Sequence, residues 1–103
     1  MRYINYVKLY IDDVRPTPVG FDLRAYTSNE AILLINKHNI DFISFDHDLG
    51  GDDTAYKVAL FIEERSSEGI KPTEYAIHSA NPVGAKRIEQ AMESANRIYN
   101  RVT

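Results

Sequence analysis

The chain has 103 residues, 44% of them hydrophobic and 26% charged, a composition typical of one soluble globular domain built around a single core. Its 12 basic and 15 acidic residues give a net charge of −3, which disfavours duplex DNA as a partner, and no segment is long and apolar enough to cross a membrane. Because the chain has no cysteine, disulfides and thiolate metal sites are excluded, and we expect one cytoplasmic domain over residues 1–103.

The first predicted strand covers residues 6–11, which are mostly β-branched or aromatic and end abruptly at Asp12 and Asp13. The segment 14–22 contains two prolines and a glycine, which exclude a regular helix or a central strand. We therefore expect a loop at this position, followed by a short extended piece over 23–26.

A capping box at Thr27 and Glu30 predicts the start of the first helix, because each side chain can satisfy a backbone N–H of the first turn. Apolar residues then recur at helical spacing, and the helix is expected to end near His38 with Asn39 in a left-handed conformation. The next predicted strand, 41–45, runs directly into a polar, glycine-terminated turn.

A second helix is expected to begin around Asp53 and Thr54, because four apolar residues follow at the spacing of one helix face. Gly69 is expected to close this helix, and residues 75–77 form the next short strand.

The last helix is predicted to start at Asn81 and Pro82, since asparagine can cap a helix and proline fits its first position. Strands and helices thus alternate along the chain, which implies right-handed crossovers and a mainly parallel sheet. The predicted fold is α/β, a three-layer receiver-like (flavodoxin-like) sandwich with a truncated sheet of about four strands covered on both faces.

Polar residues able to carry chemistry follow three of the predicted strands, at positions 12–15, 46–48 and 78–81. In an open parallel sheet, ligands bind beyond the carboxyl ends of the strands. We therefore expect one acidic pocket formed by Asp12, Asp13, Asp46 and Asp48.

Carboxylates gathered in one pocket repel each other unless a cation or a proton intervenes. A hard divalent cation such as Mg²⁺ prefers oxygen ligands, and we predict Asp12, Asp13 and Asp46 as its ligands, with Asp48 in a secondary, substrate-binding position. The alternative is that these aspartates only shape turns and cap loops.

Two histidines, His47 and His78, are candidates for proton transfer to or from a phosphate ester, although both could instead bind the backbone. Ser79, the last candidate catalytic residue, could contact the phosphate or attack it, and contact is expected because no base is placed to activate its hydroxyl. Arg15 can grip phosphate oxygens or merely pair with the neighbouring aspartates, and Asn81 can bind a ligand or merely cap a helix.

The segments KLYIDD (8–13), IDFISFD (40–46) and AIHSA (76–80) resemble the response-regulator receiver domain. This resemblance implies that Asp12 and Asp13 bind Mg²⁺, that Asp46 accepts a phosphoryl group and that Ser79 senses the phosphate. The sequence departs from the receiver pattern in lacking its first helix and its fifth strand, which carries a lysine.

A closer resemblance, carried by DDVRPTP (12–18), FDHDLGG (45–51) and HSANPVGA (78–85), is to the cyclic-phosphate processing receiver domain family of bacteria and phages. It implies a phosphodiesterase-type hydrolase, active in RNA repair, that opens a cyclic phosphate on a nucleotide or an RNA end. Mg²⁺ would polarise the phosphate, and of His47 and His78 one would activate water while the other protonates the leaving oxygen. A non-catalytic cyclic-nucleotide binder and a phosphoryl-accepting signalling module remain as alternatives.

Overall fold

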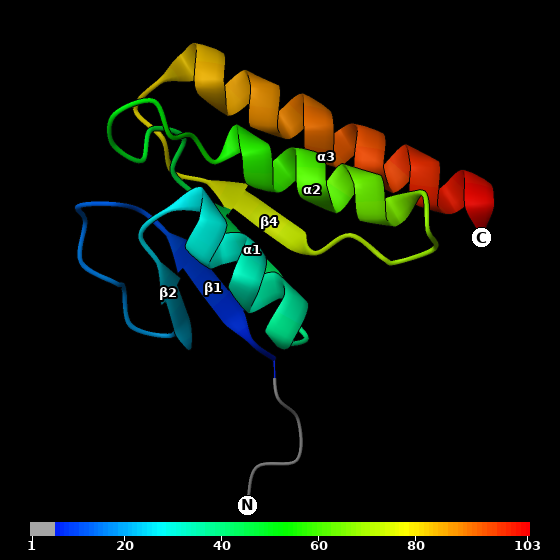
Figure 1. Cartoon of the computed structure of the whole chain (residues 1–103), viewed down its shortest axis with the longest axis horizontal. Helices are drawn as coiled ribbons and strands as arrows, with labels where there is room; N and C mark the ends of the chain where they lie inside the picture. Colours follow the sequence, from blue (N-terminus) through cyan, green and yellow to red (C-terminus); the bar gives the residue numbers. More distant parts are fainter. Residues whose placement is uncertain (1–5) are drawn as a thin grey trace, which may run out of the picture.

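The computed structural model describes residues 6–103 and shows four strands and three helices in that range (Figure 1). In chain order these elements are β1 (Lys8–Ile11), β2 (Leu23–Ala25), α1 (Ser28–Lys37), β3 (Phe42–Phe45), α2 (Tyr56–Ser66), β4 (Glu74–Ile77) and α3 (Pro82–Val102).

The four strands form one sheet in the order β2-β1-β3-β4, and every neighbouring pair is parallel. This arrangement confirms the predicted α/β, receiver-like fold class. The loops that follow β1, β3 and β4 all leave the same edge of the sheet, at the left of Figure 1. None of the helices described in residues 6–103 combines the length and apolarity that a membrane span requires.

One hydrophobic core joins the sheet to all three helices. Every second side chain of the two central strands enters it, and Leu9, Ile11, Ile43 and Phe45 are fully buried there. Helix α2 lies between α1 and α3 and contacts both, so the helices form a single layer on one face of the sheet. This layer fixes the sheet edge from which the polar loops emerge.

The opposite face of the sheet is covered by the loop between β1 and β2 in place of a helix. Its Phe21 ring packs edge-on against Tyr10, with ring centroids 5.1 Å apart, and lies 6.2 Å from the ring of Phe42. The expectation of a sheet covered on both faces thus holds only in part, because helices cover one face and a loop covers the β1 side of the other. Pro16 and Pro18 account for the missing helix, since proline lacks the backbone donor that a helix interior needs.

Most predicted boundaries agree with the structure to within two residues. The capping box of Thr27 and Glu30 is present, Asn81 caps α3, and Gly69 adopts a positive φ of 84° after α2. The predicted left-handed turn at Asn39 is wrong, since only glycines have positive φ among residues 6–103, and α1 ends on an extended His38.

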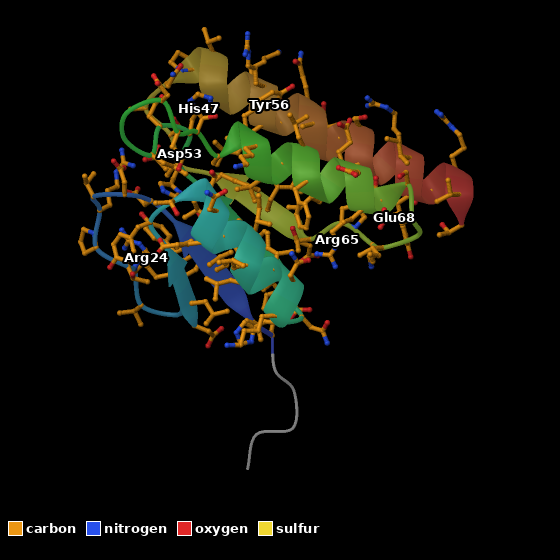
Figure 2. All side chains as sticks on the ribbon, in the orientation of Figure 1. Arg24, His47, Asp53, Tyr56, Arg65 and Glu68 are labelled. Atoms are coloured by element: carbon orange, nitrogen blue, oxygen red, sulfur yellow. The ribbon has the colours of Figure 1, made fainter. Side chains whose placement is uncertain are left out.

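The start of α2, predicted around Asp53 and Thr54, lies two to three residues later, at Tyr56, and it has no side-chain cap. Asp53 instead caps the neighbouring helix: its carboxylate accepts hydrogen bonds from the backbone N–H and the hydroxyl of Ser28, at 2.9 and 2.5 Å. This contact ties the loop after β3 to the first turn of α1, and Asp53 lies at that junction in Figure 2.

Candidate functional site

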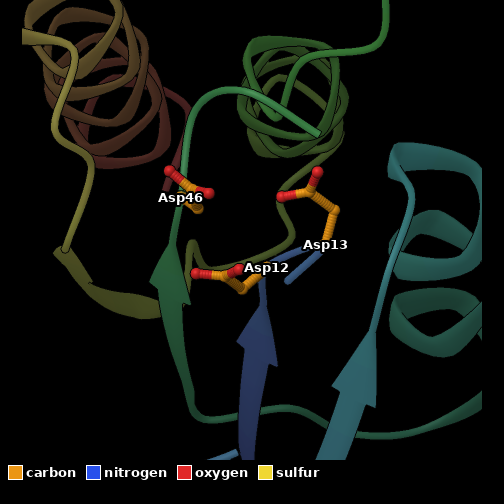
Figure 3. Close-up of side chains that lie close together, drawn as sticks. All are labelled: Asp12, Asp13 and Asp46. Carbon is orange, nitrogen blue, oxygen red and sulfur yellow. The ribbon is translucent and has the colours of Figure 1, made fainter. Parts of the chain in front are cut away.

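Three aspartates meet at the edge of the sheet where the polar loops emerge. Asp12 and Asp13 follow β1 and Asp46 follows β3, and the two strands are paired in register through Ile11 and Phe45. One carboxylate oxygen from each aspartate lies within 4.8 Å of the others (Figure 3). The structure therefore brings together the three residues that the sequence predicted as metal ligands.

Asp12 is fully buried and accepts hydrogen bonds at both carboxylate oxygens. Its Oδ1 accepts the backbone N–H groups of Val14 and Arg15, at 2.9 and 2.8 Å. Its Oδ2 lies 2.8 Å from Nη1 of Arg15 and 2.9 Å from Nε2 of His78. A carboxylate has room for about four hydrogen bonds, so the lone pairs of Asp12 are largely used within the protein.

Burial and hydrogen bonding shift the pKa values of the two buried aspartates in opposite directions. Burial alone would raise the pKa of Asp12, but the backbone donors of Arg15 and Val14, together with the Arg15 and His78 side chains, bring it well below its usual range. Asp46 has fewer donors, and burial followed by the charge of Asp12 raises its pKa. Asp12 is therefore firmly ionised, whereas the charge on Asp46 is poorly compensated.

Arg15 lies between these two carboxylates. Its Nη1 is 2.8 Å from Oδ2 of Asp12 and 3.5 Å from Oδ2 of Asp46, and its side chain remains 43% exposed. The guanidinium neutralises one of the three negative charges, which leaves an excess of about two when the aspartates are ionised. An additional cation is the natural way to stabilise that excess.

The donor set fits a hard divalent cation such as Mg²⁺, because it consists of carboxylate oxygens only. Asp13 is partly exposed, and Asp46 accepts one backbone hydrogen bond, from His47. These two aspartates would hold the ion most readily, while Asp12 could join only by giving up a hydrogen bond from Arg15 or His78.

His78 is the one histidine in residues 6–103 whose ring forms a hydrogen bond with the acidic cluster. Its Nε2 bonds Asp12, and its Nδ1 lies 2.7 Å from the hydroxyl of Ser44, on β3. The ring also stacks on Tyr10 with centroids 4.6 Å apart and planes 6° from parallel. Both ring nitrogens of His78 are thus occupied within the protein.

His47 and Asp48 belong to a second cluster, at the start of α3. Nδ1 of His47 lies 3.1 Å from Oδ1 of Asp48, and the amide of Asn81 donates to Oδ2 of Asp48 at 3.3 Å. Asn81 also accepts from the N–H of Gly84, and its own N–H donates to the hydroxyl of Ser79 at 3.0 Å. The hydrogen bonds that Asp48 accepts from His47 and, to a smaller extent, from Asn81 lower its pKa.

The imidazole of His47 packs directly against the backbone of α3 (Figure 2). A Cβ atom at Gly84 would lie 2.3 to 2.5 Å from three ring atoms of His47, so only glycine fits there. The ring is therefore held at the helix start, and its Nε2 has no hydrogen-bond partner among residues 6–103.

The predicted single pocket is therefore divided into two clusters. Asp12, Asp13, Asp46, Arg15 and His78 lie together, as expected. Asp48 does not converge with the other aspartates, because His47 and Asn81 hold its carboxylate at the start of α3. The hydroxyl of Ser79 likewise accepts a local backbone hydrogen bond and makes none to the cluster in the described residues.

Four residues that complete these clusters were not singled out by the sequence: Tyr10, Ser44, Gly84 and Arg24. Arg24 donates from Nε and Nη2 to the carbonyl oxygen of Asp12, at 3.0 and 2.6 Å, and it is labelled in Figure 2. For Tyr10 and Ser44 a signal existed, since both face the side of the sheet opposite the apolar core residues. Gly84 gave no local signal beyond being a glycine inside a helix.

Comparison with known proteins agrees with the motifs. The family model of the cyclic-phosphate processing receiver domain matches residues 7–94, a range that contains both clusters. No curated protein and no solved structure matches the chain.

Proposed function

The chain belongs to the cyclic-phosphate processing receiver domain family, and from that premise we propose that it opens a cyclic phosphate by hydrolysis with the help of a divalent cation. The observation that carries this proposal is the position of Arg15 between two carboxylates of a three-aspartate cluster. A metal-bound phosphate needs carboxylates that hold the metal and a cationic side chain beside them. The metal and the arginine then share the negative charge of the phosphate.

Arg15 would bind the phosphate group. Only Nη1 of its guanidinium is engaged with Asp12 and Asp46, so its remaining N–H groups can donate to phosphate oxygens. Its partial exposure lets a ligand reach it without rearrangement of the core.

Asp13 and Asp46 would hold the cation. Asp12 would lie beside them without being a primary ligand, because its oxygens are already hydrogen-bonded within the protein. When bound, such an ion polarises the phosphate and neutralises charge that develops during ring opening. Asp12 keeps Arg15 in place beside the ion through its two hydrogen bonds to that residue.

In the proposed reaction, the oxygen of a water molecule bonds to phosphorus while one ring P–O bond breaks. The leaving sugar oxygen takes up a proton, and the water loses one. His47 is the better donor of the two histidines, because its Nε2 has no hydrogen-bond partner among residues 6–103, whereas both nitrogens of His78 are occupied. The water would pass its proton to solvent, which reaches the site at the partly exposed Asp13 and Arg15.

The substrate would be a nucleotide or an RNA end that carries a cyclic phosphate, acted on in the cytoplasm. The net charge of −3 disfavours broad contact with a polyanion, so recognition should depend on the phosphate and the groups next to it.

The test is incubation of the purified chain with 2′,3′-cyclic nucleotides, 3′,5′-cyclic nucleotides and a short RNA ending in a cyclic phosphate, followed by phosphorus NMR with and without Mg²⁺. We expect Mg²⁺-dependent formation of a phosphomonoester from at least one substrate, lost in Asp46→Asn and reduced in His47→Ala. Asp52→Asn, an exposed change in the same loop, is the matched control and should retain turnover.

Calorimetry on the same substrates separates catalysis from binding. Saturable binding with no product would replace the hydrolase with a cyclic-nucleotide binder. If no substrate is bound and no product is formed with any divalent ion, the proposal is refuted.

A phosphoryl-accepting role is the second candidate, because the fold is receiver-like and Asp46 ends β3 beside Asp12 and Asp13. It predicts that Asp46 binds beryllofluoride in the presence of Mg²⁺, with loss in Asp46→Asn. Fluorine NMR would detect the bound species, and Asp52→Asn again serves as the control.

A further inference from the structure

A continuous chain of hydrogen bonds connects the helix-free face of the sheet to the acidic cluster. It runs from the Ser44 hydroxyl to Nδ1 of His78 over 2.7 Å, from Nε2 of His78 to Asp12 over 2.9 Å, and from Asp12 to Arg15 over 2.8 Å. Its members come from β3, the end of β4, the end of β1 and the following loop. The chain thus links the three elements that carry the candidate site.

We infer that Ser44 is a positioning residue that orients His78 and, through it, Asp12 and Arg15. The inference rests on the proposed function, in which Arg15 binds the phosphate of the substrate. Ser44 itself touches neither a carboxylate of the cluster nor Arg15, so its effect must pass through the His78 ring.

The chemistry of the three groups sets the direction of the hydrogen bonds. Asp12 is ionised and can only accept, so Nε2 of His78 must carry a proton and donate it. In the neutral ring Nδ1 is then an acceptor, and the Ser44 hydroxyl donates to it. Ser44 therefore favours the tautomer that binds Asp12.

Packing completes the control of the ring. Tyr10 stacks on His78 with planes 6° from parallel, and Ser44 and Tyr10 are register partners on neighbouring strands. Ser44 and Tyr10 are 7% and 5% exposed. Stacking restricts the plane of the ring, while the hydrogen bond from the hydroxyl to Nδ1 holds the ring in the orientation that turns Nε2, and not Cε1, toward Asp12. With the hydroxyl present, a 180° flip of the ring breaks the hydrogen bonds to both Ser44 and Asp12. Without it, the flip breaks only the bond to Asp12, so the flipped ring becomes easier to reach.

The neighbouring carboxylates explain why such control is useful. Oδ2 of Asp12 is shared between two donors, Nη1 of Arg15 and Nε2 of His78. A displaced His78 would leave a buried carboxylate short of one donor, and Asp12 would then compete more strongly for the donors of Arg15. The guanidinium would turn toward Asp12 and away from the substrate position.

The test compares Ser44→Ala with Ser44→Thr, which keeps a hydroxyl, and with Ser67→Ala, a change of the exposed serine that follows α2. Nitrogen-15 NMR of the full chain without metal would follow the ring N–H of His78, which should be slow to exchange while it donates to Asp12. We expect this signal to persist in the wild type, Ser44→Thr and Ser67→Ala and to be lost in Ser44→Ala. A persistent signal in Ser44→Ala would overturn the inference.

Turnover provides the second measurement. Ser44→Ala should lower kcat/KM for the cyclic substrate about tenfold, with Ser44→Thr restoring most of it, because loss of an outer hydrogen bond that orients a site residue has effects of this size. Unchanged turnover in Ser44→Ala would overturn the positioning role even if the NMR signal were lost. If the wild type turns over no cyclic phosphate, the proposed function fails while the NMR measurement still decides the inference.

A pair of changes at Tyr10 gives an independent check. Tyr10→Phe keeps the stacked ring and should preserve the His78 signal, whereas Tyr10→Leu removes the stacking and should broaden it. Equal signals in the two variants would show that stacking does not orient His78.

Discussion

The two histidine-containing clusters at the loop end of the sheet differ in how they are built. The cluster of Asp12, Arg15 and His78 is centred on a fully buried carboxylate and is joined by hydrogen bonds between residues up to 66 positions apart. The cluster of His47 and Asp48 is held mainly by contacts at the start of α3, and the Asp48 side chain is 63% exposed. A buried polar group is costly without its partner and an exposed one is not, so the first cluster should be rigid and the second tolerant.

The largest effect is expected for Asp12→Asn. The new amide oxygen could keep the two backbone donors, but the amide nitrogen would then face Arg15 and His78, which are donors themselves. Urea denaturation at neutral pH should show that the free energy of unfolding is about 3 kcal/mol lower than in the wild type.

The pH dependence of this loss follows from the lowered pKa of Asp12. The ionised carboxylate stabilises the folded chain above its ordinary pKa of about 4 and loses that effect as the pH falls through the lower folded value. The difference between the wild type and Asp12→Asn should therefore shrink only in strongly acidic solution. A difference below about 0.5 kcal/mol at neutral pH would contradict the rigid character of the cluster.

The next effect is expected for Gly84→Ala, which tests whether the second cluster contains a rigid element. The added methyl would overlap the His47 ring, so His47 must leave its position or α3 must shift. Thermal and urea unfolding should show that the free energy of unfolding falls by about 2 kcal/mol. Gly84→Ala combined with His47→Ala removes both partners of the clash and should recover most of it.

A smaller effect of opposite sign is expected for Asp46→Asn in the absence of metal. Burial and the charge of Asp12 raise the pKa of Asp46, so its ionised form destabilises the folded chain above that pKa. The variant should be about 1 kcal/mol more stable than the wild type at neutral pH, and the gain should disappear on acidification. Added Mg²⁺ should stabilise the wild type and not the variant.

The smallest effect is expected for Asp48→Asn. Its carboxylate is mostly exposed, and its contacts to His47 and Asn81 are at the surface. Unfolding experiments should show a change of less than about 0.5 kcal/mol. A loss as large as that of Asp12→Asn would mean that the two clusters do not differ in the way described.

The contrast between the clusters also explains what the sequence could predict. Parallel strands end at one edge of a sheet, so residues directly after β1 and β3 could be placed together from their order alone, as Asp12, Asp13 and Asp46 are. Asp48 lies two residues farther along, where the course of the loop decides its position, and no strand rule predicts it.

Long-range partners were the part that the sequence could not provide. Asp53 is two residues before Ala55, the N-cap of α2, and reads as a local cap, yet it binds Ser28 of another helix. Ser44 reads as an ordinary polar position on a strand, and its contact with His78 depends on the pairing of β3 with β4. Helix and strand patterns report local preference, whereas these roles depend on tertiary packing.

The hydrogen bonds between Asp53 and Ser28 connect ligand binding at the acidic cluster to the start of α1. The loop from Asp46 to Asp53 begins at the acidic cluster and ends on the first turn of α1, so a ligand-induced change in that loop would pull directly on a helix terminus. Amide exchange at the start of α1 would then report occupancy of the cluster from the far end of the loop. In this way a small domain could present a bound ligand to a neighbour as a change in one helix end.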